Sequence, residues 1–360
     1  MNASLSRRRL LQAGTAMAAS PLAAFAQQRP FAPQPGGWRT FELTTTVTVA
    51  EPQGTVKLWL PLPDLDTEWQ RTLDNAWTGN GRMRLVADPL RGVRMFHAEF
   101  SPDVKAPTAT LISTVQTRNR VAGAGEEDAA SLRAYTGPTE LQPVDGIVRK
   151  TALEATRGAG TDEQKARALY AWVVTHAHRE PKVRGCGTGD IKAMLETGNL
   201  GGKCADLNAL FVGLCRSVGI PARDIYGVRV APSAFGYKEL GANPAALKGA
   251  QHCRAEVYLK GRGWVAMDPA DVLKVMRQET PDWIKDTGHP LVAPVNTALF
   301  GRWEGNWIGF NTAHDIRLPG SAGKGTLPFL MYPNGENASG RFDELSPDTF
   351  KYVISAREIT

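Results

Sequence analysis

The sequence lacks the short motifs by which most nucleotide-binding and zinc enzymes are recognised. It contains neither a glycine-rich phosphate loop ending in Lys-Ser or Lys-Thr nor a G-x-G-x-x-G dinucleotide fingerprint. Its 6 histidines and 4 cysteines form neither an H-E-x-x-H nor a C-x-x-C pair, which are common zinc-ligand spacings. We therefore expect no nucleotide, metal or other cofactor.

Beyond residue 26 the chain also lacks an apolar run near the roughly 20 residues that a membrane-spanning helix needs. It has no run of Lys and Arg residues that would suit nucleic acid. We therefore expect neither a membrane span after processing nor a nucleic-acid partner. With 42% hydrophobic and 22% charged residues, the 360-residue chain has the composition of a globular protein that is long enough for two domains.

Residues 1–26 form a separate segment. An arginine cluster at residues 7–9 precedes an Ala- and Leu-rich stretch that ends in Ala-Phe-Ala at residues 24–26. This order is typical of a signal peptide, and paired arginines followed by two leucines indicate twin-arginine export. Cleavage removes three arginines and no acids, so the formal charge falls from +6 to +3. We expect a periplasmic or secreted chain that begins at Gln27, with a retained membrane anchor as the alternative.

The four cysteines are Cys186, Cys204, Cys215 and Cys253. In an oxidising compartment four cysteines usually form two disulfides, and three pairings are possible. Proteins exported by the twin-arginine route fold before export, so this fold should not depend on disulfides. A catalytic cysteine must stay free, which leaves at most one disulfide.

The order of sequence patterns predicts an α+β protein with several parts. Residues 27–37 are rich in Pro, Gln and Gly and form a predicted linker. Short β-branched segments over residues 38–120 predict an N-terminal β-sandwich domain. Helical and then strand-like patterns over residues 136–280 predict an α+β core, and residues 281–360 form a predicted β-rich C-terminal extension.

The core should contain two strong helices. Thr161 and Gln164 have the spacing of a capping box, which predicts a helix that begins just after Thr161. A second helix is predicted over residues 204–218, because apolar residues recur on one face and Gly and Pro follow. Cys204 begins this helix, where the helix dipole and the adjacent Lys203 favour a thiolate. They should lower the pKa of Cys204 from about 8.5 toward roughly 3.5–7.5.

Two further residues could complete a triad with Cys204. His252 precedes one predicted strand, and Asp268 ends the strand that follows a Gly-Arg-Gly turn. A thiol nucleophile needs an imidazole base, and the imidazole needs an acceptor that fixes its tautomer. Pairing Lys260 with Trp264 places both side chains on one face, but about four residues, or roughly 13 Å, apart. This register requires a bulge or a bent strand at His252.

Three motifs around these positions resemble one known family. They are Gly-Lys-Cys-Ala-Asp-Leu-Asn-Ala-Leu at residues 202–210, His-x-x-x-Glu-Val at 252–257, and Gly-Trp-Val-x-x-Asp-Pro at 263–269. In type, order and spacing they are similar to the bacterial transglutaminase-like family. The resemblance implies a papain-like α+β core in which Cys204 is the nucleophile, His252 the base and Asp268 the orienting acid.

The same resemblance implies chemistry on amide bonds through a thioester on Cys204. Resolution by water would give a peptidase or amidase, and resolution by an amine would give a cross-linking acyltransferase. We favour hydrolysis, because water is always present and the sequence shows no dedicated amine site. The rival interpretation is a non-catalytic envelope binding module, against which an intact triad argues. Peptide or protein amides of the cell envelope are the expected substrates.

Several other residues are weaker candidates. Asp271 competes with Asp268 for the role of acid, but only Asp268 fits the Trp-x-x-x-Asp-Pro pattern. Cys215 should lie in the core, and Cys253 should point to the strand face opposite the neighbouring histidine. Cys186 belongs to a loop that either lines the cleft or supplies a disulfide partner.

A zinc site is a conceivable alternative, although no typical spacing supports it, and would draw on His176, His178, Cys186 and Cys204. The two histidines more simply suit the end of a helix, where cations are stabilised. Trp172 and His178 are candidate oxyanion donors. Arg254 departs from the family pattern, which often has an aromatic residue two places after the histidine, and this affects the expected substrate wall.

Overall fold

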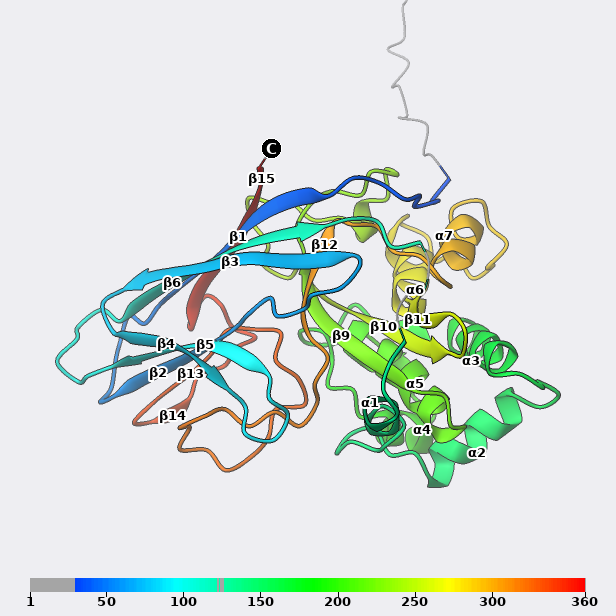
Figure 1. The fold of residues 1–360 in the computed structure, drawn as a ribbon, viewed down its shortest axis with the longest axis horizontal. Coiled ribbons are helices and arrows are strands. Elements are labelled where there is room, and N and C mark those ends of the chain that lie inside the picture. The colour runs from blue at the N-terminus through cyan, green and yellow to red at the C-terminus, as the bar shows by residue number, and fades with distance from the viewer. Residues whose placement is uncertain (1–29, 122, 124–125, 360) are drawn as a thin grey trace, which may run out of the picture.

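The computed structural model describes residues 30–121, 123 and 126–359. The predicted signal peptide, residues 1–26, lies outside the described residues, as do the first three residues of the predicted linker. The chain folds into two halves, a pair of stacked β-sheets and a second half of helices around a further sheet (Figure 1). The predicted α+β class is confirmed. Within the described residues, no helix has both the length and the apolarity that a membrane span requires.

The first half is a β-sandwich of two antiparallel sheets. One sheet has the order β15-β1-β6-β3, with β1 (Arg39–Thr48), β3 (Gln70–Gly79), β6 (Thr108–Thr117) and β15 (Lys351–Ile359). The other has the order β14-β13-β2-β5-β4, with β2 (Val56–Pro61), β4 (Arg82–Ala87), β5 (Arg94–Phe100), β13 (Asn334–Asn337) and β14 (Gly340–Arg341). Burial alternates along β1 and β6, so Phe41 and Leu111 face the core between the sheets.

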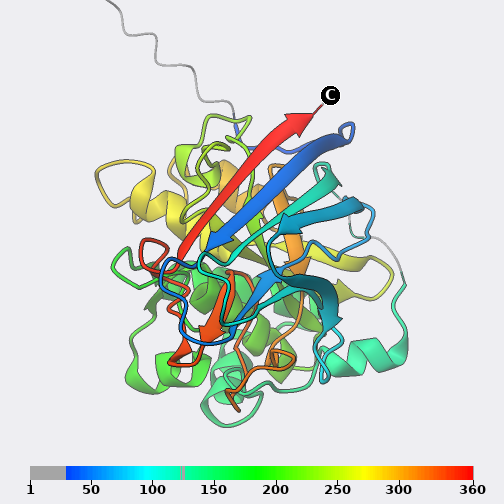
Figure 2. The same cartoon turned by 90° about the vertical axis from the view of Figure 1, so that its left-hand side faces the viewer.

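The C-terminal segment is part of both halves. We expected a β-rich C-terminal extension over residues 281–360. In the structure its strands β13, β14 and β15 complete the sandwich, and β12 (Trp307–Asn311) joins the sheet of the other half. Figure 2 shows β15 beside β1, and the two strands pair from Thr40–Ile359 to Thr48–Lys351. A strand pattern indicates that a segment is extended, but it does not indicate which distant sheet edge the segment covers.

The second half is built on the antiparallel sheet β11-β10-β9-β12, with β9 (Ala222–Arg229), β10 (Gln251–Leu259) and β11 (Gly263–Met267). Its helices are α1 (Ala129–Ala134), α2 (Gly146–Ala155), α3 (Asp162–His176), α4 (Ile191–Thr197), α5 (Cys204–Ser217), α6 (Pro269–Gln278) and α7 (Ala293–Ala298). A short 3-10 helix (Lys238–Leu240) and the parallel pair β7 (His178–Arg179) and β8 (Gly201–Gly202) complete it. The predicted capping box is confirmed, because Thr161 Oγ1 accepts from Gln164 N at 3.2 Å and Gln164 Oε1 from Thr161 N at 3.1 Å.

Helix α5 is the centre of this half, since all of its residues are buried and it packs against β9 and β10. The two halves are joined by Gln70, whose side-chain amide bonds the N–H and C=O of Gly309 at 2.7 and 2.8 Å. Ahead of β1, residues 30–37 form no regular element. Phe31 is nevertheless buried, with its ring 5.0 Å from that of Phe235.

Candidate active site

Cys204 is the first residue of α5, where backbone N–H groups lack helical acceptors. The N–H of Ala205 donates to Cys186 O at 2.9 Å, and those of Asp206 and Leu207 donate to Lys203 O at 3.1 and 2.9 Å. Among the described residues, the N–H of Cys204 itself has no acceptor. A free amide next to a nucleophilic sulfur is a ready donor for an oxyanion.

The carboxylate of Asp206 fixes the loops on either side of the thiol. It accepts from the N–H groups of Thr188 and Gly189 at 2.9 Å each and from Lys203 N at 3.0 Å. Gly187 approaches this carboxylate so closely that a Cβ would overlap it, and its φ of +91° also favours glycine. The helix start is therefore held rigidly before any substrate arrives.

His252 and Asp268 are brought together by the register of the β10–β11 hairpin. Leu259 pairs with Gly263, not Lys260 with Trp264, so our predicted register was wrong. The β10–β11 ladder ends at Ala255–Met267, and continuing its register would put Asp268 two residues, instead of four, from the position opposite His252. Diagonal neighbours of this kind are within reach of long side chains, and His252 Nε2 lies 2.8 Å from Asp268 Oδ2. The bulge that we expected is not needed.

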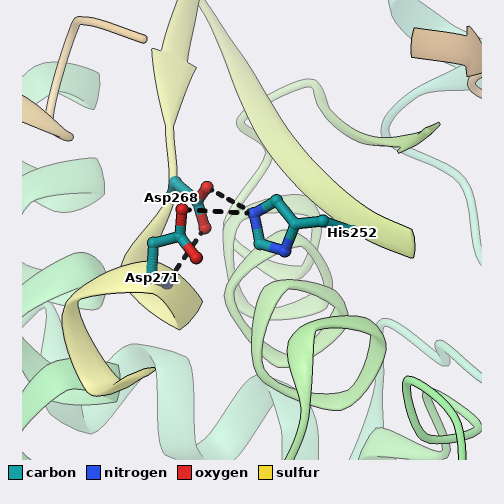
Figure 3. A group of neighbouring side chains, drawn as sticks. All are labelled: His252, Asp268 and Asp271. Carbon is teal, nitrogen blue, oxygen red and sulfur yellow. Dashed lines mark hydrogen bonds and ion pairs between the residues drawn. The ribbon is translucent and has the colours of Figure 1, made fainter. Parts of the chain in front are cut away.

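A second carboxylate faces the same imidazole nitrogen (Figure 3). Asp271, one turn into α6, has Oδ2 at 3.4 Å from His252 Nε2, and its other oxygen pairs with Arg229 at 2.5 Å. Asp268 caps α6 by accepting from Asp271 N at 3.2 Å. The histidine therefore rests against a carboxylate pair, of which Asp268 makes the shorter contact.

Three buried side chains contact His252, Asp268 or the strand beside them. Asn208, one turn after the thiol on α5, donates to Cys253 O at 2.8 Å and to Asp268 Oδ1 at 3.2 Å. Trp307 of β12 donates to the backbone carbonyl of His252 at 2.9 Å. Arg254 Nε lies 3.6 Å from Asp268 Oδ2, behind the acid and away from the cavity lining. Arg254 therefore offsets acid charge and does not form the substrate wall.

The electrostatics favour a charged thiolate and imidazolium pair. Hydrogen bonds from Cys186 and then Cys253, followed by His252, hold the pKa of Cys204 well below its usual value, although burial opposes them. Burial and Arg229 act to lower the pKa of His252, but Asp271 and Asp268 outweigh them and the pKa is raised. Opposite shifts widen the pH range in which both groups are charged.

Cys204 and His252 line one cavity of about 300 Å³ between the two halves. The volume is at the lower end of the range for ligand sites. One wall comes from α5, α6 and β7. The opposite wall includes Tyr332, Leu345 and Tyr352 from the C-terminal segment, so the completed sandwich also shapes the site.

The other cysteines take three different positions, and all four are free thiols. Cys186 lines the cavity and lies between two acceptors, Gln251 O at 3.3 Å and the Cys204 sulfur. Cys253 is buried against Cys204 but is not part of the lining. Cys215 is fully buried in α5, as expected of a core residue.

The alternative zinc set is not brought together. His176 stacks on Trp172 at the end of α3, with ring centroids 4.7 Å apart, and His178 lies near Trp283. Neither histidine lines the cavity, whereas Cys186 and Cys204 both do. The metal-capable cluster found in the described part of the chain is His252, Asp268 and Asp271, but Arg229 and Arg254 already supply cationic partners to its carboxylates.

Three residues of the candidate site were not predicted from the sequence: Asn208, Gln251 and Tyr332. Asn208 and Gln251 lie within or beside the recognised motifs, at positions that a helix-face or strand-neighbour argument could have found. Gln251 lines the cavity, and its Nε2 has no partner within the described residues. Tyr332 is more than a hundred residues from Cys204 in sequence, and no local pattern marks it.

Comparison with known proteins agrees with this geometry. Residues 149–269 match the transglutaminase-like superfamily. An uncharacterized protein of Haemophilus influenzae is 33% identical over 342 residues, which cover 89% of this chain and 91% of the relative. This chain belongs to the transglutaminase-like superfamily.

Solved structures resemble the chain only distantly in sequence. A provisionally named cysteine protease of Cytophaga hutchinsonii is 15% identical, with 90% of this chain and 99% of the other covered and a TM-score of 0.49. The periplasmic domain of TgpA from Pseudomonas aeruginosa is also 15% identical, with 64% and 91% covered and a TM-score of 0.34. The superfamily match spans α5, β9, β10 and β11 and includes Cys204, His252 and Asp268.

Proposed function

We propose that this protein is an exported cysteine enzyme that acts on amide bonds through Cys204, His252 and Asp268. The observation that carries the proposal is the meeting of a lowered-pKa thiol and an acid-bound imidazole in one cavity. The superfamily match supports a cysteine enzyme in general. The triad and the amide substrate are our inference from the site.

The reaction starts with attack of the Cys204 thiolate on an amide carbonyl. The carbonyl oxygen becomes an oxyanion that the free N–H of Cys204 can bind. Because Nε2 of His252 faces Asp268, Nδ1 is the nitrogen left to donate a proton to the departing amine. The C–N bond breaks as the amine leaves, and an acyl thioester remains on Cys204.

Water or a second amine then resolves the thioester. His252 takes a proton from the incoming nucleophile, the C–S bond breaks, and the thiolate is regenerated. We propose hydrolysis, so that the enzyme is a peptidase or amidase, because water enters any open cavity. Amine transfer is the alternative. Hydrolysis gives a free carboxylic acid and amine transfer gives a cross-linked amide, so analysis of the product distinguishes the two reactions.

Alkylation of Cys204 tests the proposal without a known substrate. Iodoacetamide should modify Cys204 at mildly acidic pH, where an ordinary thiol with pKa of about 8.5 is protonated. The rate should fall in His252→Ala, and a chelator should not change it. A zinc enzyme would instead carry stoichiometric metal, which would protect the thiol, and slow labelling at all pH values below about 8 would favour a vestigial binding module.

Export requires a separate test. Replacing Arg7 and Arg8 with lysine should trap the precursor inside the cell, since the transporter reads the arginines. N-terminal sequencing of exported protein should give Gln27. Exported protein that begins at Met1 would contradict the predicted cleavage.

A further inference from the structure

The cavity beside Cys204 is rich in positive charge. Its lining contains five cationic side chains, Arg179, Lys203, Arg229, Lys248 and Lys274, and one carboxylate, Asp271. The neutral part of the lining is mostly glycine, alanine and aromatic residues. An excess of cationic side chains in a cavity next to a nucleophile favours anionic ligands.

Three of the five cations have acidic partners. Arg229 pairs with Asp271 at 2.5 Å, Lys274 lies 3.4 Å from Glu239, and Lys248 pairs with Asp348 at 2.8 Å. These contacts leave three lining cations with their charge largely offset.

Arg179 and Lys203 are different. Arg179 Nε donates to the neutral amide of Gln278 at 2.9 Å, and neither cation has an ion pair with a carboxylate of the described residues. Their backbones are adjacent, because β7 and β8 pair Arg179 with Gly202. Lys203 directly precedes the nucleophile, and both cationic side chains line the same cavity as Cys204.

These like charges are close enough to affect each other. Burial and then Arg179 lower the pKa of Lys203, and Arg179 also opposes the charge of Lys274, whose pKa is lowered chiefly by burial. An anion placed between Arg179 and Lys203 would relieve this repulsion and gain charge-assisted hydrogen bonds.

We propose that Arg179 and Lys203 bind a substrate carboxylate next to the scissile amide, so that the enzyme acts on anionic peptides. The inference rests on the proposed function and specifies its substrate class. The carboxylate belongs to the peptide C-terminus or to an acidic side chain. A cavity of about 300 Å³ has room for only a few amino acids around that group.

The test compares two small probes of the thiol, anionic iodoacetate and neutral iodoacetamide. Both react with the thiolate, so the ratio of their rates at Cys204 cancels changes in thiol pKa and reports only the preference for negative charge. The ratio in the mature protein should exceed that of free cysteine by about tenfold at low salt and decrease as salt is added. Mass spectrometry of the Cys204 peptide separates this reaction from that of Cys186.

Matched variants assign the preference to the two cations. Arg179→Gln and Lys203→Gln should each lower the ratio by roughly three- to tenfold, whereas Arg179→Lys and Lys203→Arg should keep most of it. Lys182→Gln is the control, because Lys182 is exposed, lies near Arg179 in sequence and does not line the cavity. It removes the same charge and should leave the ratio nearly unchanged.

Peptide protection then identifies the source of the carboxylate. A dipeptide with a free C-terminus, a C-terminally amidated dipeptide containing Glu, and its Gln counterpart are each added before iodoacetamide. Protection of Cys204 by the free C-terminal dipeptide or by the Glu dipeptide, but not by the Gln dipeptide, supports the proposal. Which of the two acidic peptides protects identifies the position of the carboxylate. A probe ratio equal to that of free cysteine, or best protection by the Gln peptide, overturns it while the proposed function stands. Failure of both probes to label Cys204 removes the proposed function as well.

Discussion

The two ends of α5 carry two buried thiols with opposite properties. Cys204 begins the helix and Cys215 lies near its end, and neither forms a disulfide. Burial raises the pKa of Cys215 far above its usual value, with only Arg216 acting in the other direction. At Cys204 the same burial is outweighed by two thiols and an imidazole. The surroundings of a thiol, and not its exposure, therefore decide the direction in which its pKa is shifted in this protein.

The largest expected effect is a loss of turnover on substitution of Cys204, with little loss on substitution of Cys215. Cys204→Ala and His252→Ala should each lower turnover by about 10³-fold or more, because members of a triad act as a unit. Cys215→Ala should stay within a few-fold of the wild type, since Cys215 is not part of the cavity lining. Amine release from a peptide-amide library measures all three. Equal losses at Cys204 and Cys215 would mean that the helix start has no special chemistry.

The next effect separates the two carboxylates. Asp268→Asn should lower turnover by roughly 10²-fold, because the imidazole loses its shorter acceptor but stays in place. Asp271→Asn should cost less activity, as its contact to His252 is 3.4 Å and part of its charge is held by Arg229. Both variants need a folding check by circular dichroism, since each leaves a buried arginine without its full partner. A larger loss in Asp271→Asn would make Asp271 the orienting acid.

The sequence predicted the local parts of this site better than their assembly. The start of α5, the capping box of α3 and the strands on each side of the hairpin follow from periodicity, caps and turn residues, which are short-range signals. The hairpin register was wrong by two residues in the His252–Asp268 offset, because a Gly-Arg-Gly turn permits more than one loop closure. The wall containing Tyr332 and Tyr352 could not be predicted from local patterns. Tyr352 lies on β15, which pairs with β1 some three hundred residues away, and Tyr332 lies in an irregular segment just before β13.

Of the two cysteines on α5, Cys215 is the one at which we expect a substitution to change stability. Cys215→Ser places a hydroxyl in a fully buried position of α5 and should lower the free energy of unfolding by about 1–3 kcal/mol. The lower end of this range applies if the hydroxyl bonds the helix carbonyl one turn earlier. Urea unfolding of the wild type and of Cys215→Ala provides the reference. The Cys204 alkylation rate should not change, and a change would show that the two ends of α5 are coupled.

The smallest effect concerns the neighbour that most favours the Cys204 thiolate. Cys186→Ala removes a hydrogen-bond donor, so the pKa of Cys204 should rise and the acidic limb of its alkylation profile should move to higher pH. The shift should be about one pH unit or less, because a net hydrogen bond is worth about 1 kcal/mol and one unit corresponds to about 1.4 kcal/mol. Cys186→Ser retains a donor and should move the limb less, although Gln251 O competes for the same hydrogen. Turnover, unlike alkylation, should also fall at high pH as His252 loses the proton that it gives to the departing amine. This basic limb of the activity profile should stay in place in both variants, since Asp271 and Asp268 raise the pKa of His252 against burial. If Cys186→Ala instead abolishes labelling at every pH while the protein remains folded, Cys186 and not Cys204 is the reactive thiol.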